Sequence, residues 1–451
     1  MKLPGNVSWN ESDGQDTPDA TKGPDAPDTV ILISKGIYPA GAAPFDGYIK
    51  LSGGRIVEMA PGTPGKKAIE NTASELIDED RREQPVAPGP RIIDVGDNII
   101  IPGLIDLHIH GSFGFDVASP DSEAIPSLAR YLAGTGTTSF LPTLGAMPIG
   151  LTDQIVKRVS RLAAKKGGNH VSEAHRKPPG AHILGLHLEG PFLNPEKKGA
   201  MREEYLLEPS VGLMARWFDL GEGTINRVTI APELPGAREV VSFLVDRGVT
   251  VAAGHTMAGY EQALDALAWG VTVANHTYNA MREFCHRDPG MLGAVLTDNR
   301  IWAEILCDGI HVHPAAALIV LAAKGRGRVC LVSDALAPAG LLPGSYTSLG
   351  HDITVDEEGR AYLANGVLAG STGTLLEGVK NMMRWTGGAL EDILPMATIN
   401  PAVLAGVSGS KGSLAPGKDA DLVVLDNEHN VVFSLVNGTV IEGTHLEHGT
   451  T

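Results

Sequence analysis

The chain has 451 residues, of which 43% are hydrophobic and 20% charged, and its formal net charge is −17. Such an acidic chain excludes nucleic acid and anionic membrane surfaces as partners, because both would repel it. Its apolar runs are shorter than the roughly 20 residues that cross a bilayer, and its N-terminus lacks the pattern of a signal peptide. We therefore expect a globular, cytoplasmic protein whose three cysteines are mostly buried thiols rather than a disulfide framework.

The N-terminal part begins with a polar stretch and continues with short strands. Residues 1–28 contain hardly any apolar side chains to offset the entropy of ordering, so we expect a disordered acidic tail. Short apolar runs between turn residues then predict four strands, at residues 30–33, 47–51, 55–59 and 92–95. Residues 52–54 are typical of a tight turn, and the polar residues 63–90 predict a surface loop.

From residue 99 to about residue 335, apolar strand-like runs alternate with amphipathic helix-like segments. The strand-like runs are residues 99–108, 138–144, 183–188, 227–231, 249–253, 271–275, 301–307 and 328–333. The amphipathic segments between them include residues 122–132, 151–164, 237–247, 260–269 and 314–324. Eight β/α units are the number in a closed barrel, so we expect an α/β protein with a (β/α)8 TIM-like barrel.

The C-terminal part returns to short strands. After two helix-like segments, residues 375–385 and 390–398, the pattern predicts strands at residues 420–425 and 431–436, and Asn437 with Gly438 predicts a hairpin turn. These strands are similar in length and character to the N-terminal ones, so we expect both termini to form one small β-sandwich domain. The predicted domains are a metal-dependent barrel at residues 99–390 and a β domain in two parts, residues 29–98 and 391–445.

The first barrel strand ends in a pair of histidines, His108 and His110, which share one face because alternate residues of a strand point the same way. An isolated pair could equally form local hydrogen bonds. Further ligand-type residues end other apolar runs, however, and these are Glu189, His255, His276 and Asp334. Because side chains at the C-terminal ends of barrel strands converge on one mouth, the sequence predicts that these residues lie together.

Imidazole and carboxylate groups suit zinc or iron(II), and a divalent ion can lower the pKa of a bound water to about 7 for hydrolysis. We assign Asp334 as the carboxylate that takes the proton of that water and returns it to a leaving nitrogen. The alternative for Asp334 is a helix N-cap after the eighth strand. His187 shares a face with Glu189, and we expect it either behind the ligands or in the core.

With these residues the chain resembles the amidohydrolase superfamily, and residues 412–425 are similar to its usual closing motif. Within that superfamily it looks like the N-acetylglucosamine-6-phosphate deacetylases. The motifs that carry the resemblance read HLEGPF, KGA, GHT, HTYNAM, RDPG, DGIHV and SDALAPAG, and they begin at His187, Lys198, Gly254, His276, Arg287, Asp308 and Ser333. The activity that the resemblance implies is metal-dependent hydrolysis of the acetamide of N-acetylglucosamine 6-phosphate to glucosamine 6-phosphate and acetate.

The resemblance also implies roles for single residues. Glu189, His255 and His276 would hold the principal divalent ion, which we expect to be zinc, with iron(II) as the alternative. Because the chain keeps His108 and His110, a second ion can bind beside them. The number of ions is therefore one or two. Asp334 would be the acid and base of the reaction.

For the substrate, the resemblance implies that Asn279 and the backbone of Ala280 bind the sugar, while Arg287 and His311 face its phosphate. In the family this arginine comes from the neighbouring subunit of a homodimer, and its guanidinium suits a phosphate because it donates two parallel hydrogen bonds. Without the motif around it, Arg287 would be interpreted as a surface arginine beside a turn. Met201 stands where the family often has a histidine that contacts substrate, which leaves the preferred N-acetyl amino sugar open.

Two other functions are compatible with parts of this pattern. One is an amidohydrolase that acts on a cyclic amide or on an N-acyl amino acid, against which Arg287, His311 and Asn279 argue. The other is a scaffold that kept the barrel and lost its active site. Since every predicted ligand is present, we expect an enzyme.

Overall fold

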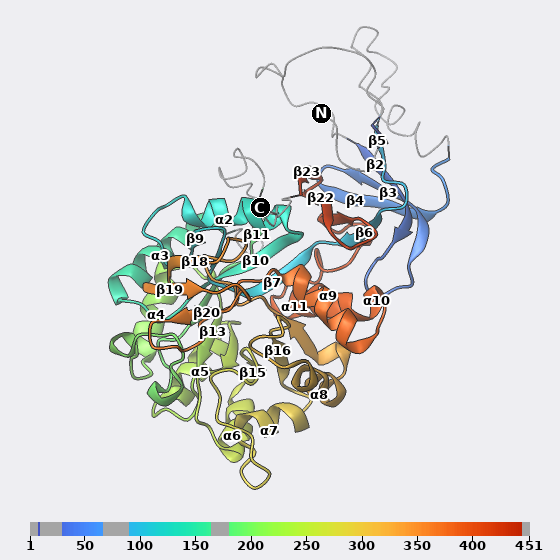
Figure 1. Cartoon of the computed structure of the whole chain (residues 1–451). Coiled ribbons are helices and arrows are strands. Elements are labelled where there is room, and N and C mark those ends of the chain that lie inside the picture. Colours follow the sequence, from blue (N-terminus) through green and yellow to red (C-terminus); the bar gives the residue numbers. More distant parts are fainter. Residues whose placement is uncertain (1–7, 10–28, 66–89, 164–179, 444–451) are drawn as a thin grey trace.

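The computed structural model describes residues 8–9, 29–65, 90–163 and 180–443, and it confirms the expected α/β barrel (Figure 1). Neighbouring barrel strands pair in parallel, as the β/α alternation requires. In chain order the strands are β7 (Leu104–Ile109), β10 (Thr137–Leu144), β12 (Leu186–Glu189), β13 (Ile225–Ile230), β14 (Thr250–Ala253), β15 (Val271–Ala274), β16 (Trp302–Ile305) and β17 (Val329–Leu331). A short strand, β11 (His182–Ile183), also pairs with β10.

The barrel closes through the residues that follow its first and last strands. Ile109 forms a parallel bridge with Ala335. The backbone N–H of Asp334 donates to the carbonyl of His108 at 2.8 Å, and that of His110 donates to the carbonyl of Ala335 at 2.9 Å. Backbone hydrogen bonds therefore hold the predicted ligands of strands β7 and β17 beside each other.

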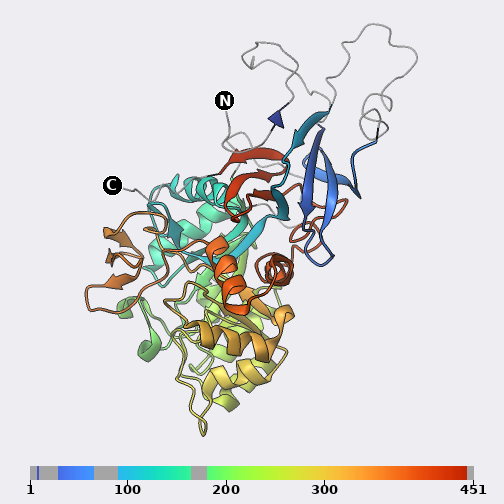
Figure 2. The same ribbon diagram turned by 45° about the vertical axis from the view of Figure 1, so that its right-hand side comes forward.

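A helix follows each barrel strand and covers its outer face (Figures 1 and 2). The helices are α2 (Ala124–Gly134), α3 (Ile149–Leu162), α4 (Val211–Leu220), α5 (Ala237–Val245), α6 (Tyr260–Trp269), α7 (Gly290–Thr297), α8 (Pro314–Lys324) and α9 (Leu375–Thr386). Helices α4 and α7 are absent from the predicted segments. The buried residues of α7 run without interruption from Gly290 to Val295, so that helix has no polar face to produce a helical period.

Strands from both chain ends build the small β domain, as predicted. They are β1 (Ser8–Trp9), β2 (Val30–Ile37), β3 (Phe45–Ser52), β4 (Arg55–Pro61), β5 (Arg91–Asp94), β6 (Ile99–Pro102), β21 (Leu422–Leu425), β22 (Val431–Val436) and β23 (Thr439–Glu442). They enclose a core of their own, which includes Leu32, Ile49 and Phe433. Both predicted tight turns are confirmed, since β3 and β4 pair across residues 53–54, and β22 and β23 across Asn437 and Gly438. The expected tail lies outside the described residues except for β1, and residues 66–89 of the expected loop lie outside them too.

The apolar run expected as one strand, residues 99–108, is divided at Gly103. Its first part, β6, pairs with β2 and β21 of the small domain, and its second part, β7, enters the barrel. A Cβ atom on Gly103 would lie 1.9 Å from Oγ1 of Thr138, so only glycine fits where the chain passes from one sheet to the other. The division into two strands depends on this close approach, which the hydrophobicity of the sequence does not indicate.

Two further segments complete the chain after strand β17. A three-stranded sheet that the sequence did not predict follows it, formed by β18 (Gly344–Ser348), β19 (His351–Val355) and β20 (Ala361–Leu363). Short helices α10 (Leu390–Ile393) and α11 (Ile399–Leu404) then precede the last strands, and Ala402 and Leu404 pack with barrel residues such as Leu107.

Two expectations drawn from composition concern the cysteines and the membrane. Cys307 and Cys330 are buried free thiols, and Cys285 is an exposed one. Among the residues that the structure describes, none of the helices has the length and apolarity needed to span a bilayer.

Candidate metal centre

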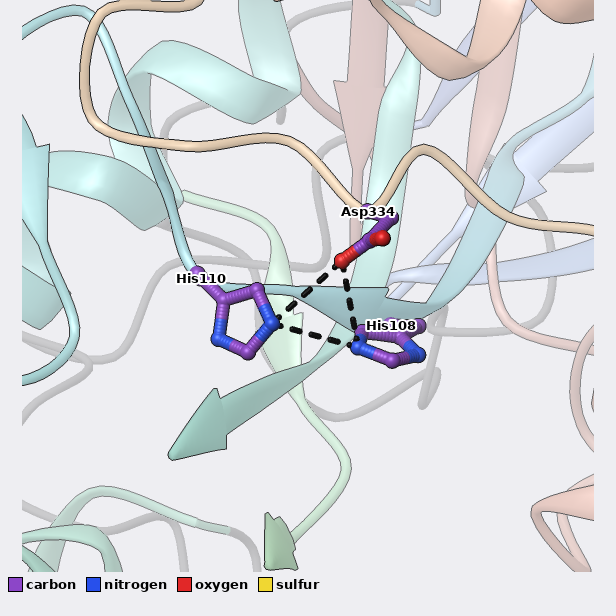
Figure 3. A group of neighbouring side chains, drawn as sticks. All are labelled: His108, His110 and Asp334. Atoms are coloured by element: carbon purple, nitrogen blue, oxygen red, sulfur yellow. Dashed lines mark hydrogen bonds and ion pairs between the residues drawn. The ribbon is translucent and has the colours of Figure 1, made fainter. Parts of the chain in front are cut away.

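The first histidine pair meets Asp334 at the mouth of the barrel. His108 lies on β7, His110 follows its end, and Asp334 follows β17. The Nε2 atoms of the two histidines are 3.2 Å apart, and each is 3.3 Å from Oδ1 of Asp334. Figure 3 shows the three side chains pointing toward one another. The predicted convergence of these strand ends is therefore present.

A second group lies next to the first and consists of Glu189, His255 and His276. Oε1 of Glu189 is 3.1 Å from Nε2 of His255 and 3.0 Å from Nε2 of His276. Oε2 of Glu189 is 3.2 Å from Nε2 of His110, and Oε1 is also 3.5 Å from Nε2 of His108. Glu189 therefore borders both groups, and we call the two together the six-residue cluster.

All four histidines of the cluster are oriented by an acceptor at Nδ1. The carbonyl oxygens of Thr143, Lys197 and Asn279 lie 3.1, 2.8 and 3.1 Å from Nδ1 of His110, His255 and His276, respectively. Oδ1 of Asn275 lies 3.0 Å from Nδ1 of His108. A carbonyl oxygen can only accept a hydrogen bond, so Nδ1 carries a proton in each ring and Nε2 is the nitrogen that faces the centre. Metal-binding histidines have this arrangement.

The electrostatics of the cluster favour positive charge at its centre. Burial lowers the pKa of His110, but hydrogen bonds with Asp334 and Glu189 outweigh it and raise that pKa to about 10. Burial is likewise outweighed at His276, where Glu189 raises the pKa to about 9. Burial raises the pKa of Glu189, yet His108 and the other imidazoles keep it well below its usual range. A divalent cation supplies the same positive charge, so the donor set fits a metal ion.

The backbone at three of the ligand positions is strained. His255, His276 and Asp334 have φ angles of +49°, +26° and +49°. Non-glycine residues rarely adopt such angles, and they persist where the surrounding structure holds them for a function. Asp334 is not a helix N-cap, since the next helix, α9, is capped by Thr374. That alternative for Asp334 is therefore wrong.

A cavity of about 480 Å³ opens over the cluster and contains several of the predicted substrate residues. Asn279, Ala280 and His311 line it, and so does Met201. His311 holds Nδ1 2.6 Å from Oδ2 of Asp308 and Nε2 2.6 Å from the carbonyl of Ala369. Both ring nitrogens thus face acceptors, which an imidazolium satisfies by donating twice.

Arg287 is the predicted site residue that the structure does not bring to this cavity. It is exposed in the loop between β15 and α7, where its Nε lies 3.1 Å from Nε2 of His286. Of the described residues, those that line the cavity do not include it. Within one chain, Arg287 is therefore a surface residue beside a turn.

Sequence reasoning missed Asn275, which connects the two halves of the cluster. Its Nδ2 donates to Oε1 of Glu189 at 2.7 Å, while its Oδ1 faces His108. A polar residue at the end of a buried strand, next to His276, was the signal that could have identified it. His187 is fully buried behind the ligands, with its ring 4.9 Å from that of His108 and its Nε2 2.8 Å from Oγ1 of Thr229.

Part of the cavity wall was also missed. Residues 195–201 form one wall, and the sequence pointed only to residues 198–201 of it, through the KGA motif and Met201. Residues 195–197, a short 3-10 helix, and residues 367–370, which form another wall, carry no periodic pattern that places them at the barrel mouth.

Comparison with known proteins shows the family of this chain. The model of the amidohydrolase family matches residues 99–444. The N-acetylglucosamine-6-phosphate deacetylase of Bacillus subtilis is 34% identical over 360 residues, covering 79% of this chain and 88% of the relative. The N-acetylgalactosamine-6-phosphate deacetylase of Escherichia coli O157:H7 is 36% identical over 329 residues, covering 73% and 84%.

A solved structure is similar over nearly the whole chain. A single-residue mutant of N-acetyl-D-glucosamine-6-phosphate deacetylase from Mycobacterium smegmatis, in complex with N-acetyl-D-glucosamine-6-phosphate, superposes with a TM-score of 0.79 at 28% identity. The match covers 92% of this chain and 99% of that one. The family expected from the motifs is confirmed, and this chain belongs to the amidohydrolase family.

Proposed function

We propose that this protein hydrolyses the acetamide of N-acetylglucosamine 6-phosphate and releases acetate and glucosamine 6-phosphate. One observation carries the proposal: four imidazoles with Nε2 turned inward surround two carboxylates beneath an open cavity. The similarity to deacetylases of N-acetylated amino sugar phosphates supplies the substrate class.

We assign the six-residue cluster to divalent metal ions, of which zinc suits the imidazole and carboxylate ligands best and iron(II) is the alternative. Glu189, His255 and His276 form one set, and His108, His110 and Asp334 form the other. Because Glu189 borders both sets, the arrangement supports two ions. A divalent ion held by these residues would polarise an acyl carbonyl and lower the pKa of a bound water.

Asp334 acts as the acid and base in this proposal. Burial raises the pKa of its carboxyl, but His108 and His110 hold that pKa below its usual value, so the group is ionised at neutral pH. An ionised carboxylate can accept the proton of the attacking water. It then returns that proton to the leaving nitrogen of the sugar.

The cavity walls position the sugar. Asn279 and the backbone of Ala280 border the cluster and offer hydrogen bonds to its hydroxyl groups. Burial lowers the pKa of His311, but Asp308 outweighs burial and raises it, which favours the charged form of the ring on this side of the cavity. We assign the phosphate to this side of the cavity.

We further propose that the protein acts as a homodimer in which Arg287 reaches the phosphate in the cavity of the partner. The support is the exposure of Arg287 on its loop, with a guanidinium that suits phosphate. A location in the cytoplasm remains a prediction from the sequence.

A second substrate is supported by one comparison. The Escherichia coli O157:H7 relative, 36% identical, is an N-acetylgalactosamine-6-phosphate deacetylase, a name that differs only in the configuration of the sugar. Met201 lines the cavity and is an apolar neighbour for whichever sugar binds. Whether the protein prefers the glucosamine or the galactosamine configuration of the sugar is therefore the question to test.

Acetate release from a panel of substrates tests the proposal. The panel contains N-acetylglucosamine 6-phosphate, N-acetylgalactosamine 6-phosphate, unphosphorylated N-acetylglucosamine and an N-acetyl amino acid, each with and without a chelator. We expect the highest kcat/KM for the first, loss of activity with chelator, and recovery when zinc or iron(II) is returned. Release from the amino acid alone would overturn the proposed substrate, and activity insensitive to chelation would overturn the metal assignment.

A further inference from the structure

The loop after strand β12 is tied directly to one histidine of the cluster. Residues 195–201 of this loop line the cavity, and we call them the wall segment. The backbone N–H of Asn194, just before it, donates to the carbonyl of His255 at 3.0 Å, and the carbonyl of Lys197 accepts from Nδ1 of His255 at 2.8 Å. The orientation of His255 therefore depends on where the wall segment lies.

The carboxylate of Glu233 binds residues next to both the wall segment and His255. Its Oε1 accepts from Nδ2 of Asn194 at 2.9 Å and from the backbone N–H of Met257 at 2.6 Å. Its Oε2 accepts from Oγ1 of Thr256 at 2.5 Å. Glu233 follows strand β13, whereas the other two segments follow β12 and β14. Three consecutive loops of the barrel mouth thus meet at one side chain.

Thr256, which Glu233 contacts, is also hydrogen-bonded to the loop on the substrate side of the cavity. The backbone N–H of Thr256 donates to the carbonyl of Ala280 at 3.0 Å, and that of Arg282 donates to the carbonyl of Thr256 at 2.9 Å. A shift of Thr256 would therefore move the loop that carries Asn279 and Ala280. Of the described residues, those that line the cavity do not include Glu233, so it acts through its neighbours.

We propose that Glu233 is a positioning residue, which holds the wall segment and His255 as one unit so that Nε2 of His255 stays directed at Glu189. The proposal rests on the metal role given above to Glu189, His255 and His276. Hydrogen bonds to an ionised carboxylate are stronger than those between neutral groups, and His255 needs the support because its φ angle is +49°. Loss of a partner that orients a metal-binding histidine typically lowers metal affinity by about 10- to 100-fold.

Two substitutions of Glu233 separate its hydrogen bonds from its bulk. Glu233→Ala removes all three acceptor contacts. Glu233→Gln keeps a carbonyl oxygen for Asn194 and Met257, and its amide can donate to the hydroxyl of Thr256, which also accepts hydrogen bonds. Asp356→Ala is the matched control, because the carboxylate of Asp356 accepts from the backbone N–H groups of Glu358 and Arg360 in a turn outside the cavity walls.

Zinc titration of the metal-stripped full-length protein by calorimetry gives the first readout. We expect Glu233→Ala to weaken the site of Glu189, His255 and His276 by about 10- to 100-fold and to leave the site of His108, His110 and Asp334 unchanged. Glu233→Gln should recover most of that loss, and Asp356→Ala should bind as the wild type does. Unchanged zinc affinity in a folded Glu233→Ala, or equal weakening of both sites, would overturn the proposal.

Hydrogen exchange of the metal-free protein gives a readout that needs no metal. Glu233→Ala should speed exchange in residues 194–201 and in residues 255–257 together, and Glu233→Gln should not. Faster exchange in only one segment would refute the coupling. If Glu233→Ala does not fold, Thr256→Val, which removes one contact at nearly constant volume, takes its place with the same two expectations. Wild-type protein that binds no divalent ion would instead overturn the proposed function, while the exchange result still decides the role of Glu233.

Discussion

Oε2 of Glu189 lies 3.2 Å from Nε2 of His110, although the other oxygen of the same carboxylate faces His255 and His276. One side chain at the end of strand β12 thus contacts ligands that follow β7, β14 and β15. A carboxylate in this position can contribute one oxygen to each of two ions. Both proposed sites should therefore depend on Glu189.

Glu189→Gln should remove both ions, whereas the double change of His108 and His110 to Ala should remove one. The reason is that Glu189 borders both groups, while the histidine pair serves only the first. Metal content of purified protein, measured by plasma mass spectrometry, distinguishes the two results. One full ion retained in Glu189→Gln would contradict the shared role.

Asp334→Asn should keep the ion of Glu189, His255 and His276 but lower turnover by about 10²- to 10⁴-fold, because the amide cannot accept and return a proton. Acetate release at saturating substrate measures turnover, and metal content is measured on the same preparation. Asp356→Asn, which alters a turn carboxylate outside the cavity walls, is the control. Turnover close to that of the wild type would remove Asp334 from the chemistry.

Arg287→Ala should raise KM for the phosphorylated sugar far more than for unphosphorylated N-acetylglucosamine, since the guanidinium would contact only the phosphate. Arg287→Lys should recover part of the effect, because lysine keeps the charge but loses the paired donors. Since Arg287 does not line the cavity of its own chain, sedimentation should also show a dimer. An equal rise in KM for both sugars would argue against the phosphate contact.

Asp308→Asn should destabilise the protein within a limited pH range. Burial opposes the charge of both Asp308 and His311, but their contact lowers the pKa of Asp308 below 3.8 and raises the pKa of His311 above 6.5. The contribution of Asp308 is present above its unfolded pKa and is lost as pH falls through the lowered folded value. The contribution of His311 is full below pH 6.5 and is lost as pH rises through its raised folded value.

The free energy of unfolding, from denaturant titrations between pH 3 and pH 9, therefore checks the pair. The difference between wild type and Asp308→Asn should be largest near pH 5 and should shrink toward both ends of that range. A difference that does not vary with pH would show that the pair is not ionised.

Arg227→Met alone should lower the free energy of unfolding by about 3–5 kcal/mol, because it leaves the carboxylate of Glu304 charged and buried without its partner. Both side chains are fully buried in the barrel, on β13 and β16, and they form an ion pair. The double change Arg227→Met and Glu304→Leu replaces the pair by apolar groups and should cost much less. Denaturant midpoints of the three proteins test this. A double variant as unstable as the single one would contradict the explanation.

Much of this protein follows from local patterns in the sequence. The β/α alternation predicted the barrel, because parallel strands buried on both faces read as apolar runs and each needs a helix before the next. Since the ends of such strands converge, the positions of Glu189, His255, His276 and Asp334 at the ends of apolar runs were enough to predict that they lie together. The hairpin at Asn437 and Gly438 was equally local, since both residues adopt positive φ angles, as its turn requires.

Other features depend on contacts between segments that are far apart in the chain. Thr138 sets the break between strands at Gly103. Asn194 and Thr256 donate hydrogen bonds to Glu233, and Asn275 orients His108. None of these pairs has a periodic or compositional signature, because a hydrogen bond or a close approach is specified by position in space. The sequence alone determined which chemical groups stand at the strand ends, and only the tertiary structure decided how each is oriented, because orientation comes from neighbours that folding brings together.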